Sequence, residues 1–143
     1  LRRQRQMCIR DSGMGERISF AGAVANTELP ALLRAHSFYA SAVPTDGVSA
    51  SLLEAMACGC FPIVVDNDAN RDWVTDGETG RLLTDPSPEA FAAALAAAWQ
   101  DSSSRERARR TNLAVVRERA NLDTNMRTIE ERYAALVAMA QRN

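Results

Sequence analysis

The segment Phe61–Asp66 (FPIVVD) is the feature that most constrains how this chain folds. Its first five residues form an unbroken apolar run, which is typical of a parallel strand that other elements cover on both faces. Parallel strands cannot be joined by tight hairpins, because each connection must cross over the sheet, usually through a helix. The run therefore predicts an α/β domain rather than an all-helical or antiparallel one.

Segments with strand and helix patterns alternate around this run, as a parallel α/β sheet requires. The predicted strands are Arg17–Val24, Ser37–Ala42, Phe61–Asp66 and Arg81–Thr84. The predicted helices are Glu28–Ala35 with Thr27 as its cap, a helix capped by Ser49 that continues through Cys58 and stops at Gly59, Asn70–Thr75, and a helix that begins at Ser87. We expect a partial Rossmann-like parallel sheet with flanking helices, and a sheet of four strands is thin for such a fold.

From Ser102 onward the pattern is helical to the end, so C-terminal helices are expected to follow the sheet. Apolar residues between Met126 and Ala140 recur at helical spacing and form a strong stripe. We expect this stripe to leave an exposed apolar surface. The arginines between Arg105 and Arg119 alternate with Glu106 and Glu118, which favours a solvated face with intrahelical ion pairs. The alternative for this run is a site for a polyanion.

Residues 1–12 (LRRQRQMCIRDS) differ from the rest of the chain. They carry four arginines without any helical or alternating apolar pattern, and no apolar stretch follows that would make them a signal peptide. Two interpretations stay open, a non-native leader and a disordered basic arm. We therefore expect residues 13–143 to form the domain, and we expect that domain to be incomplete.

The composition excludes several classes of function. The formal net charge of −1 argues against a dedicated nucleic-acid binder. All 17 basic residues are arginine, so neither a Schiff-base lysine nor a P-loop lysine can come from this chain. The longest apolar stretch, Ala90 to Trp99, is too short for a transmembrane segment. Three cysteines cannot form a secreted disulfide framework, which favours a reducing compartment.

In open parallel sheets, ligands bind beyond the carboxyl ends of the strands. Three loops meet that edge here, namely the loop after Val24, the loop Pro44–Ser49 and the loop Asn67–Asn70. The second loop leads into a helix whose first turn offers the unpaired N–H groups of Ser49, Ala50 and Ser51 together with the positive end of the helix dipole. Such a helix start suits an anion, and a diphosphate in particular.

Two carboxylates lie on either side of this helix start. Glu54 lies one turn into the helix, on the face of Ala50 and Ser51, where it could accept hydrogen bonds from the vicinal hydroxyls of a ribose. Each such bond to a charged acceptor contributes about 1.5–3 kcal/mol. Asp46 precedes the helix and would lie on the far side of the phosphates, where a sugar would be. Spacing alone leaves a second interpretation equally open, in which Asp46 is a turn residue and Glu54 a surface residue.

A longer motif surrounds these residues. The segment Asp46–Asp66 (DGVSASLLEAMACGCFPIVVD) is followed from Asn70 by NRDWVTDGETGRLL. Together they resemble the C-terminal domain of family 4 (group 1) retaining glycosyltransferases of the GT-B fold. The signature is an acid, seven residues and a Glu, then Ala-Met-Ala-x-Gly, an apolar strand and an Asp-Gly-x-x-Gly turn. The resemblance spans residues 16–133.

The resemblance implies roles for individual residues. Glu54 would bind the ribose of the donor nucleotide, and Asp46 would be the catalytic-site acid beside the donor sugar. The remaining donor-binding positions would be Gly47, Ser49, Ala50 and Ser51 around the diphosphate, and Val24, whose main chain would border the base. The sequence departs from the family in three places. Asp46 stands where Glu is usual, and Val48 and Ser49 replace glycines that are common in this loop. Asp68–Ala69–Asn70 stands where Gly-Gly is common after the following strand, which implies changed contacts with the sugar or the acceptor.

The resemblance also implies a reaction, the transfer of a sugar from a nucleotide-sugar donor to an acceptor hydroxyl with retention. The acceptor would be a carbohydrate or a lipid-linked molecule of the kind used in bacterial cell-envelope polysaccharide synthesis. The implied enzyme needs no metal or other cofactor. It does need an N-terminal domain, so this fragment alone is not expected to catalyse the reaction. It would lie in the cytoplasm, or peripherally at the inner membrane face through the missing domain, with no nucleic-acid partner and no transmembrane segment.

Two other classes of function stay open. One is a nucleotide-sugar epimerase of the same fold, and the other is a non-catalytic interaction module built on a Rossmann-like half. The single histidine, His36, and the pair Cys58 and Cys60 are interpreted as structural residues, because no nucleophile or further metal ligand accompanies them.

Overall fold

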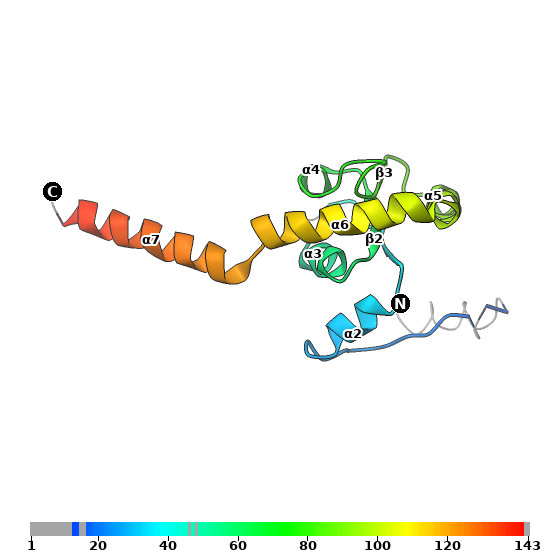
Figure 1. Ribbon diagram of the computed structural model, residues 1–143, viewed down its shortest axis with the longest axis horizontal. Helices are drawn as coiled ribbons and strands as arrows, with labels where there is room; N and C mark the ends of the chain where they lie inside the picture. Colours follow the sequence, from blue (N-terminus) through cyan, green and yellow to red (C-terminus); the bar gives the residue numbers. More distant parts are fainter. Residues whose placement is uncertain (1–12, 15–16, 46, 48, 142–143) are drawn as a thin grey trace.

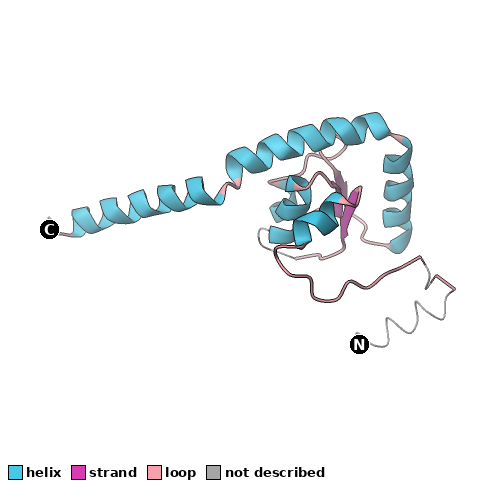
Figure 2. Cartoon of the chain, turned by 60° about the horizontal axis from the view of Figure 1, so that its bottom comes forward, coloured by secondary structure: helices cyan, strands magenta, loops and turns pink. Residues whose placement is uncertain are grey.

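In the computed structural model, residues 13–14, 17–45, 47 and 49–141 are described, and three parallel strands lie at the centre of the fold. They are β1 (Phe38–Ser41), β2 (Phe61–Val65) and β3 (Arg81–Leu83), in the spatial order β1-β2-β3. Phe38 pairs with Phe61, and Ile63 pairs with Arg81. All five residues of β2 are buried, which confirms that this strand is covered on both faces (Figure 2).

Six helices are described around and after the sheet (Figure 1). They are α2 (Leu29–Arg34), α3 (Ala50–Ala57), α4 (Asp68–Arg71), α5 (Pro88–Gln100), α6 (Ser102–Arg119) and α7 (Leu122–Ala140). Ser49 and Ser87 cap α3 and α5, because their hydroxyls accept from the backbone N–H groups of Leu52 and Ala90. Gly59 follows α3 with φ of 90°, a left-handed conformation that favours glycine. The caps and the stop predicted for these helices are thus confirmed.

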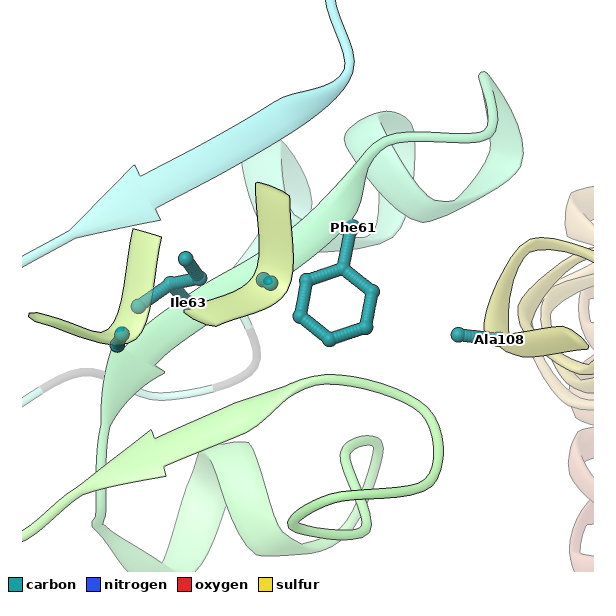
Figure 3. Packing of buried hydrophobic residues seen from close by; sticks show 5 residues of the cluster. Phe61, Ile63 and Ala108 are labelled. Atoms are coloured by element: carbon teal, nitrogen blue, oxygen red, sulfur yellow. The ribbon is translucent and has the colours of Figure 1, made fainter. Parts of the chain in front are cut away.

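The core lies on both faces of the sheet because successive strand residues point to opposite sides. Phe61 and Ile63 of β2 face α5 and α6, and Figure 3 shows Phe61 between its strand and Ala108 of α6. Val64 faces the other way and packs with Leu52 and Met56 of α3. The result is a sheet between two helical layers, which agrees with the predicted fold class.

The predicted strand at residues 17–24 is wrong. The structure describes these residues without strand pairing, and Ile18 and Phe20 are 39% and 48% exposed. A strand needs a hydrogen-bonded neighbour, and β1 is not paired with residues 17–24. Strands that follow each other in the sequence need not be adjacent in a doubly wound sheet. The described sheet therefore has three strands instead of the expected four.

Two helix starts also differ from the prediction. Glu28, not Thr27, is the N-cap residue of α2, and it makes no capping hydrogen bond through its side chain. The short helix α4 begins at Asp68 rather than Asn70, because the Asn67 side chain accepts from the N–H of Asn70 at 2.9 Å. Asn70 is buried inside the helix and donates its amide to the carbonyl oxygen of Val65 at 2.7 Å.

Helix α7 extends away from the sheet as a single rod (Figure 1). It has no buried residue, and its apolar stripe is exposed, with Tyr133 and Leu136 at 67% and 62%. This confirms the exposed apolar surface expected from residues 126–140. Within the described residues, no helix is long and apolar enough to cross a membrane.

We expect the isolated chain to self-associate through this stripe, because a large exposed apolar patch seldom persists on a monomer. Replacing Ile129 and Leu136 by glutamate should shift the chain toward monomer in sedimentation velocity. The control, Arg127→Glu on the same helix, should leave the distribution of species unchanged. A wild-type chain that sediments as a single monomer and melts cooperatively would contradict this expectation.

Candidate functional site

The start of α3 lies at the carboxyl edge of the sheet, because the chain reaches it directly after β1 ends at Ser41. The Ser49 hydroxyl and carbonyl oxygen both accept from the N–H of Leu52, at 3.4 and 3.1 Å. Within the described part of the chain, the backbone N–H groups of Ala50 and Ser51 have no acceptor. The first turn of α3 therefore keeps two donors and the positive end of its dipole for an anion.

A row of three hydroxyl groups lies at this helix start. The Tyr39 hydroxyl oxygen is 2.7 Å from Oγ of Ser51, which in turn is 3.1 Å from Oγ of Ser49. Tyr39 belongs to β1 and packs with the side chains of α3. Tyr39 is not among the site residues predicted from the sequence. The one signal that could have found it is strand alternation, which places Tyr39 on the opposite face from Phe38.

Glu54 is exposed and lines a cavity of about 320 Å³ between α2 and α3. The other wall is formed by Asn26, Leu29, Pro30, Leu33 and Arg34. Asn26 follows the half-buried Val24 by two residues, so the segment after Val24 and the carboxylate of Glu54 meet at one cavity. Its volume lies at the lower end of the range of about 300–1,000 Å³ that is usual for small-molecule sites.

The structure brings together only part of the predicted site. Ser49, Ala50, Ser51 and Glu54 lie along one short helix, as the spacing predicted. Gly47 is exposed, with no neighbouring atom within 4 Å of the place that a Cβ would take. Asp46 lies outside the described residues, so its predicted position beside a sugar stays a prediction.

The third loop at this edge adds charged groups that the sequence analysis did not assign. Arg71 donates to Asp66 at 2.6 Å and to Asp68 at 2.9 Å. The hydrogen bond from Arg71 lowers the pKa of the Asp66 carboxyl, which stays ionised at neutral pH. Asn67 donates to the carbonyl oxygen of Pro44 at 3.4 Å, so this loop is tied to the loop before α3.

The cysteines and the histidine have structural surroundings. Cys60 is buried, and its thiol donates to the carbonyl oxygens of Leu33 and His36. Burial raises the pKa of this thiol, so it is a poor nucleophile at neutral pH. Nδ1 of His36 lies 2.7 Å from the carbonyl oxygen of Leu32, which ties the ring to the preceding helix α2. Across the described ranges, no three His, Cys, Asp or Glu side chains lie close enough together to hold a metal ion.

Comparisons with known proteins place this arrangement in context. Residues 2–113 match the model of a family described as glycosyl transferases group 1. The C-terminal domain of a group 1 family protein, LpcC from Francisella tularensis, is 24% identical with a TM-score of 0.74, and the match covers 85% of this chain. HepE from Anabaena, in complex with UDP, is 20% identical over 93% of this chain, with a TM-score of 0.83. Sucrose-phosphate synthase from Thermosynechococcus elongatus is 21% identical over 96% of this chain, with a TM-score of 0.87.

The chain spans 63% of the LpcC domain, 36% of HepE and 35% of the sucrose-phosphate synthase. At these identities the likeness establishes a shared fold. Among curated proteins, none matches this chain.

Proposed function

Because the chain belongs to the family of glycosyl transferases group 1, we propose that it forms the donor-binding part of a retaining glycosyltransferase. Its fold is that of the C-terminal domain of GT-B enzymes. The proposed reaction transfers a sugar from a nucleoside-diphosphate sugar to the hydroxyl of a carbohydrate or lipid-linked acceptor. A longer protein carries it out, with an N-terminal domain supplying the acceptor site.

The observation that carries this proposal is the cavity between α2 and α3. Glu54 lines it opposite the segment that follows Val24. Glu54 lies one turn along α3 from a helix start where the N–H groups of Ala50 and Ser51 have no acceptor among the described residues. A nucleoside diphosphate needs three neighbouring features, namely a place for the base, an acceptor for ribose hydroxyls and donors for phosphate oxygens. The structures of HepE with UDP and with UDP-glucose add support, because that protein shares this fold.

In the proposed mechanism, the first turn of α3 binds the diphosphate through the N–H groups of Ala50 and Ser51. The same groups stabilise the charge that grows on the leaving diphosphate as the glycosidic bond breaks, which lowers the barrier of the transfer step. The hydroxyls of Ser49 and Ser51 add donors there. Glu54 accepts from the ribose hydroxyls, and Asp46 orients the donor sugar. As the resemblance implies, the proposal includes no metal or other cofactor.

The proposed compartment is the cytoplasm, and peripheral attachment to the inner membrane face through a further domain is the alternative. The proposed role is in bacterial cell-envelope polysaccharide synthesis. Both statements rest on the resemblance to the family.

Glu54→Gln tests the proposal in the full-length enzyme. We expect this change to weaken the affinity for a nucleoside diphosphate by about 1.5 kcal/mol, roughly tenfold, because an amide is a poorer acceptor than a carboxylate for ribose hydroxyls. The measurement is calorimetric titration with UDP, GDP and ADP in turn. The control Glu118→Gln, an exposed glutamate on α6, should bind each of them as the wild type does. Unchanged affinity for the bound nucleotide would remove Glu54 from the site.

Experiments on the same full-length protein distinguish the proposed transferase from the two alternative functions. An epimerase would convert the nucleotide sugar in the absence of any acceptor, and product analysis without acceptor would reveal it. A non-catalytic interaction module would bind none of the three nucleotides even as the complete chain.

A further inference from the structure

A larger groove of about 1000 Å³ lies at the opposite edge of the sheet, where the strands begin. Ser37, just before β1, and Phe61, the first residue of β2, lie at its base. The last turns of α2 and α3 form one side, and residues of α6 form the other. The groove and the cavity of Glu54 share Arg34, Ala57 and Cys58 at the ends of α2 and α3, but Glu54 does not line the groove. The proposed donor site therefore does not account for this groove.

The charged residues that line the groove are mainly positive, although the formal net charge of the whole chain is −1. Its lining includes the four arginines Arg34, Arg105, Arg109 and Arg117, and a single carboxylate, Glu106. A concave surface lined by one sign of charge focuses its field, which raises the local concentration of ligands of the opposite sign.

Two of these arginines are held in place by the protein. Arg105 donates to the carbonyl oxygens of Ala98 and Trp99 at the end of α5, and its guanidinium lies 5.5 Å from the centre of the Phe38 ring. Arg109 pairs with Glu106, with Nε 3.0 Å from Oε2. The intrahelical pairs expected along α6 are therefore present only in part of this arginine run.

The other two arginines have no such partner. Arg34 at the end of α2 and Arg117 on α6 are exposed and have no hydrogen-bond acceptor or ion pair anywhere in the described ranges. They come from different elements, 83 positions apart in the sequence, and yet line the same groove. Their guanidinium groups are free to bind an anion from solution.

The spacing of the cations indicates an elongated ligand. Arg105 and Arg117 are twelve positions apart on α6, which corresponds to about 18 Å along the helix axis. A single phosphate group cannot reach guanidinium groups spread over that length. The concave shape of the groove also disfavours the flat surface of a lipid bilayer.

The ion pair of Arg109 indicates which kind of anionic group fits the groove. One carboxylate, Glu106, already occupies two donors of Arg109. A phosphate group carries more charge and offers three acceptor oxygens, so it can bridge two guanidinium groups where a carboxylate satisfies one. We propose that this groove binds an elongated soluble ligand that bears at least two phosphate groups.

The test uses tripolyphosphate as the probe and calorimetric titration of the full-length protein. The double variant Arg34→Ala with Arg117→Ala should weaken binding at least tenfold. The control Arg110→Ala with Arg127→Ala removes the same charge from exposed arginines outside the groove and should leave the affinity within twofold of wild type. If the alanine pair fails to fold, Arg34→Gln with Arg117→Gln keeps much of each side-chain stem and takes its place.

Four results would overturn the proposal. They are no binding of tripolyphosphate at millimolar concentration, an equal loss of affinity in the control pair, equally tight binding of an oligoglutamate of the same charge, and preferential binding to vesicles that contain phosphatidic acid over soluble tripolyphosphate. The oligoglutamate result would mean attraction by charge alone, and the vesicle result would assign the groove to a lipid surface.

Discussion

Replacing Gly80 by alanine is expected to lower the free energy of unfolding by about 3 kcal/mol, the upper end of the usual cost of overpacking. A Cβ at this position would lie 2.6 Å from Cγ of Pro62, 2.7 Å from the carbonyl oxygen of Pro62 and 2.8 Å from Cγ1 of Val74. The carbonyl oxygen belongs to the central strand and Val74 is part of the core, so neither can move without disturbing packing on the sheet. The turn before β3 therefore requires glycine for space, and not for an unusual φ.

Urea denaturation of the alanine variant against the wild-type chain measures this loss. Gly47→Ala is the matched control, because no atom lies within 4 Å of a Cβ placed there and its stability should change by less than about 0.5 kcal/mol. A Gly80→Ala variant as stable as the control would mean that the turn does not pack against Pro62 as described.

The same turn is fixed from the other side by α6. Thr79 is buried, and its carbonyl oxygen accepts from the side-chain amide of Asn112, which is fully buried, at 2.9 Å. The Thr79 hydroxyl accepts from the N–H of Thr75 at 2.7 Å. The conformation of the Asp-Gly-x-x-Gly motif, residues 76–80, is thus explained by its packing between the sheet and α6.

Local signals were sufficient for the parts of the fold that depend on neighbouring residues. The apolar run of β2 identified a buried strand, and Ser49 and Ser87 identified two helix starts, because capping and burial act over a few residues. The same locality explains why α3, with Ser51 and Glu54 on it, could be placed from spacing alone.

Other features depend on contacts between distant segments, and the sequence pattern could not supply them. Residues 17–24 have a strand pattern, but a strand also needs a paired neighbour, and these residues have no strand pairing in the described structure. Likewise, the hydrogen bond between Tyr39 and Ser51 and the cavity shared by Asn26 and Glu54 join different elements. No local sequence pattern indicates contacts of this kind.

The second large effect is expected for Asp46→Asn in the full-length enzyme. Asp46 precedes the first residue of α3 by four positions, and Glu54 follows that residue by four, so a diphosphate at the helix start would lie between them. We propose that Asp46 holds the donor sugar in its reacting geometry. Loss of such positioning costs about 100-fold in rate, because alignment of the reacting groups is part of the barrier.

Asp46→Asn should therefore lower the transfer rate constant about 100-fold while the affinity for the nucleoside diphosphate stays within about twofold of wild type, since that ligand carries no sugar. Glu54→Gln should affect the nucleotide instead, so the two variants separate the roles of the two carboxylates. Asp46→Glu restores the acid that is usual in the family and should retain more activity than Asp46→Asn. Steady-state rates and calorimetry on the same preparations supply both quantities. If Asp46→Asn weakens the bare diphosphate as much as the sugar nucleotide, Asp46 shapes the loop before α3 and does not contact the sugar.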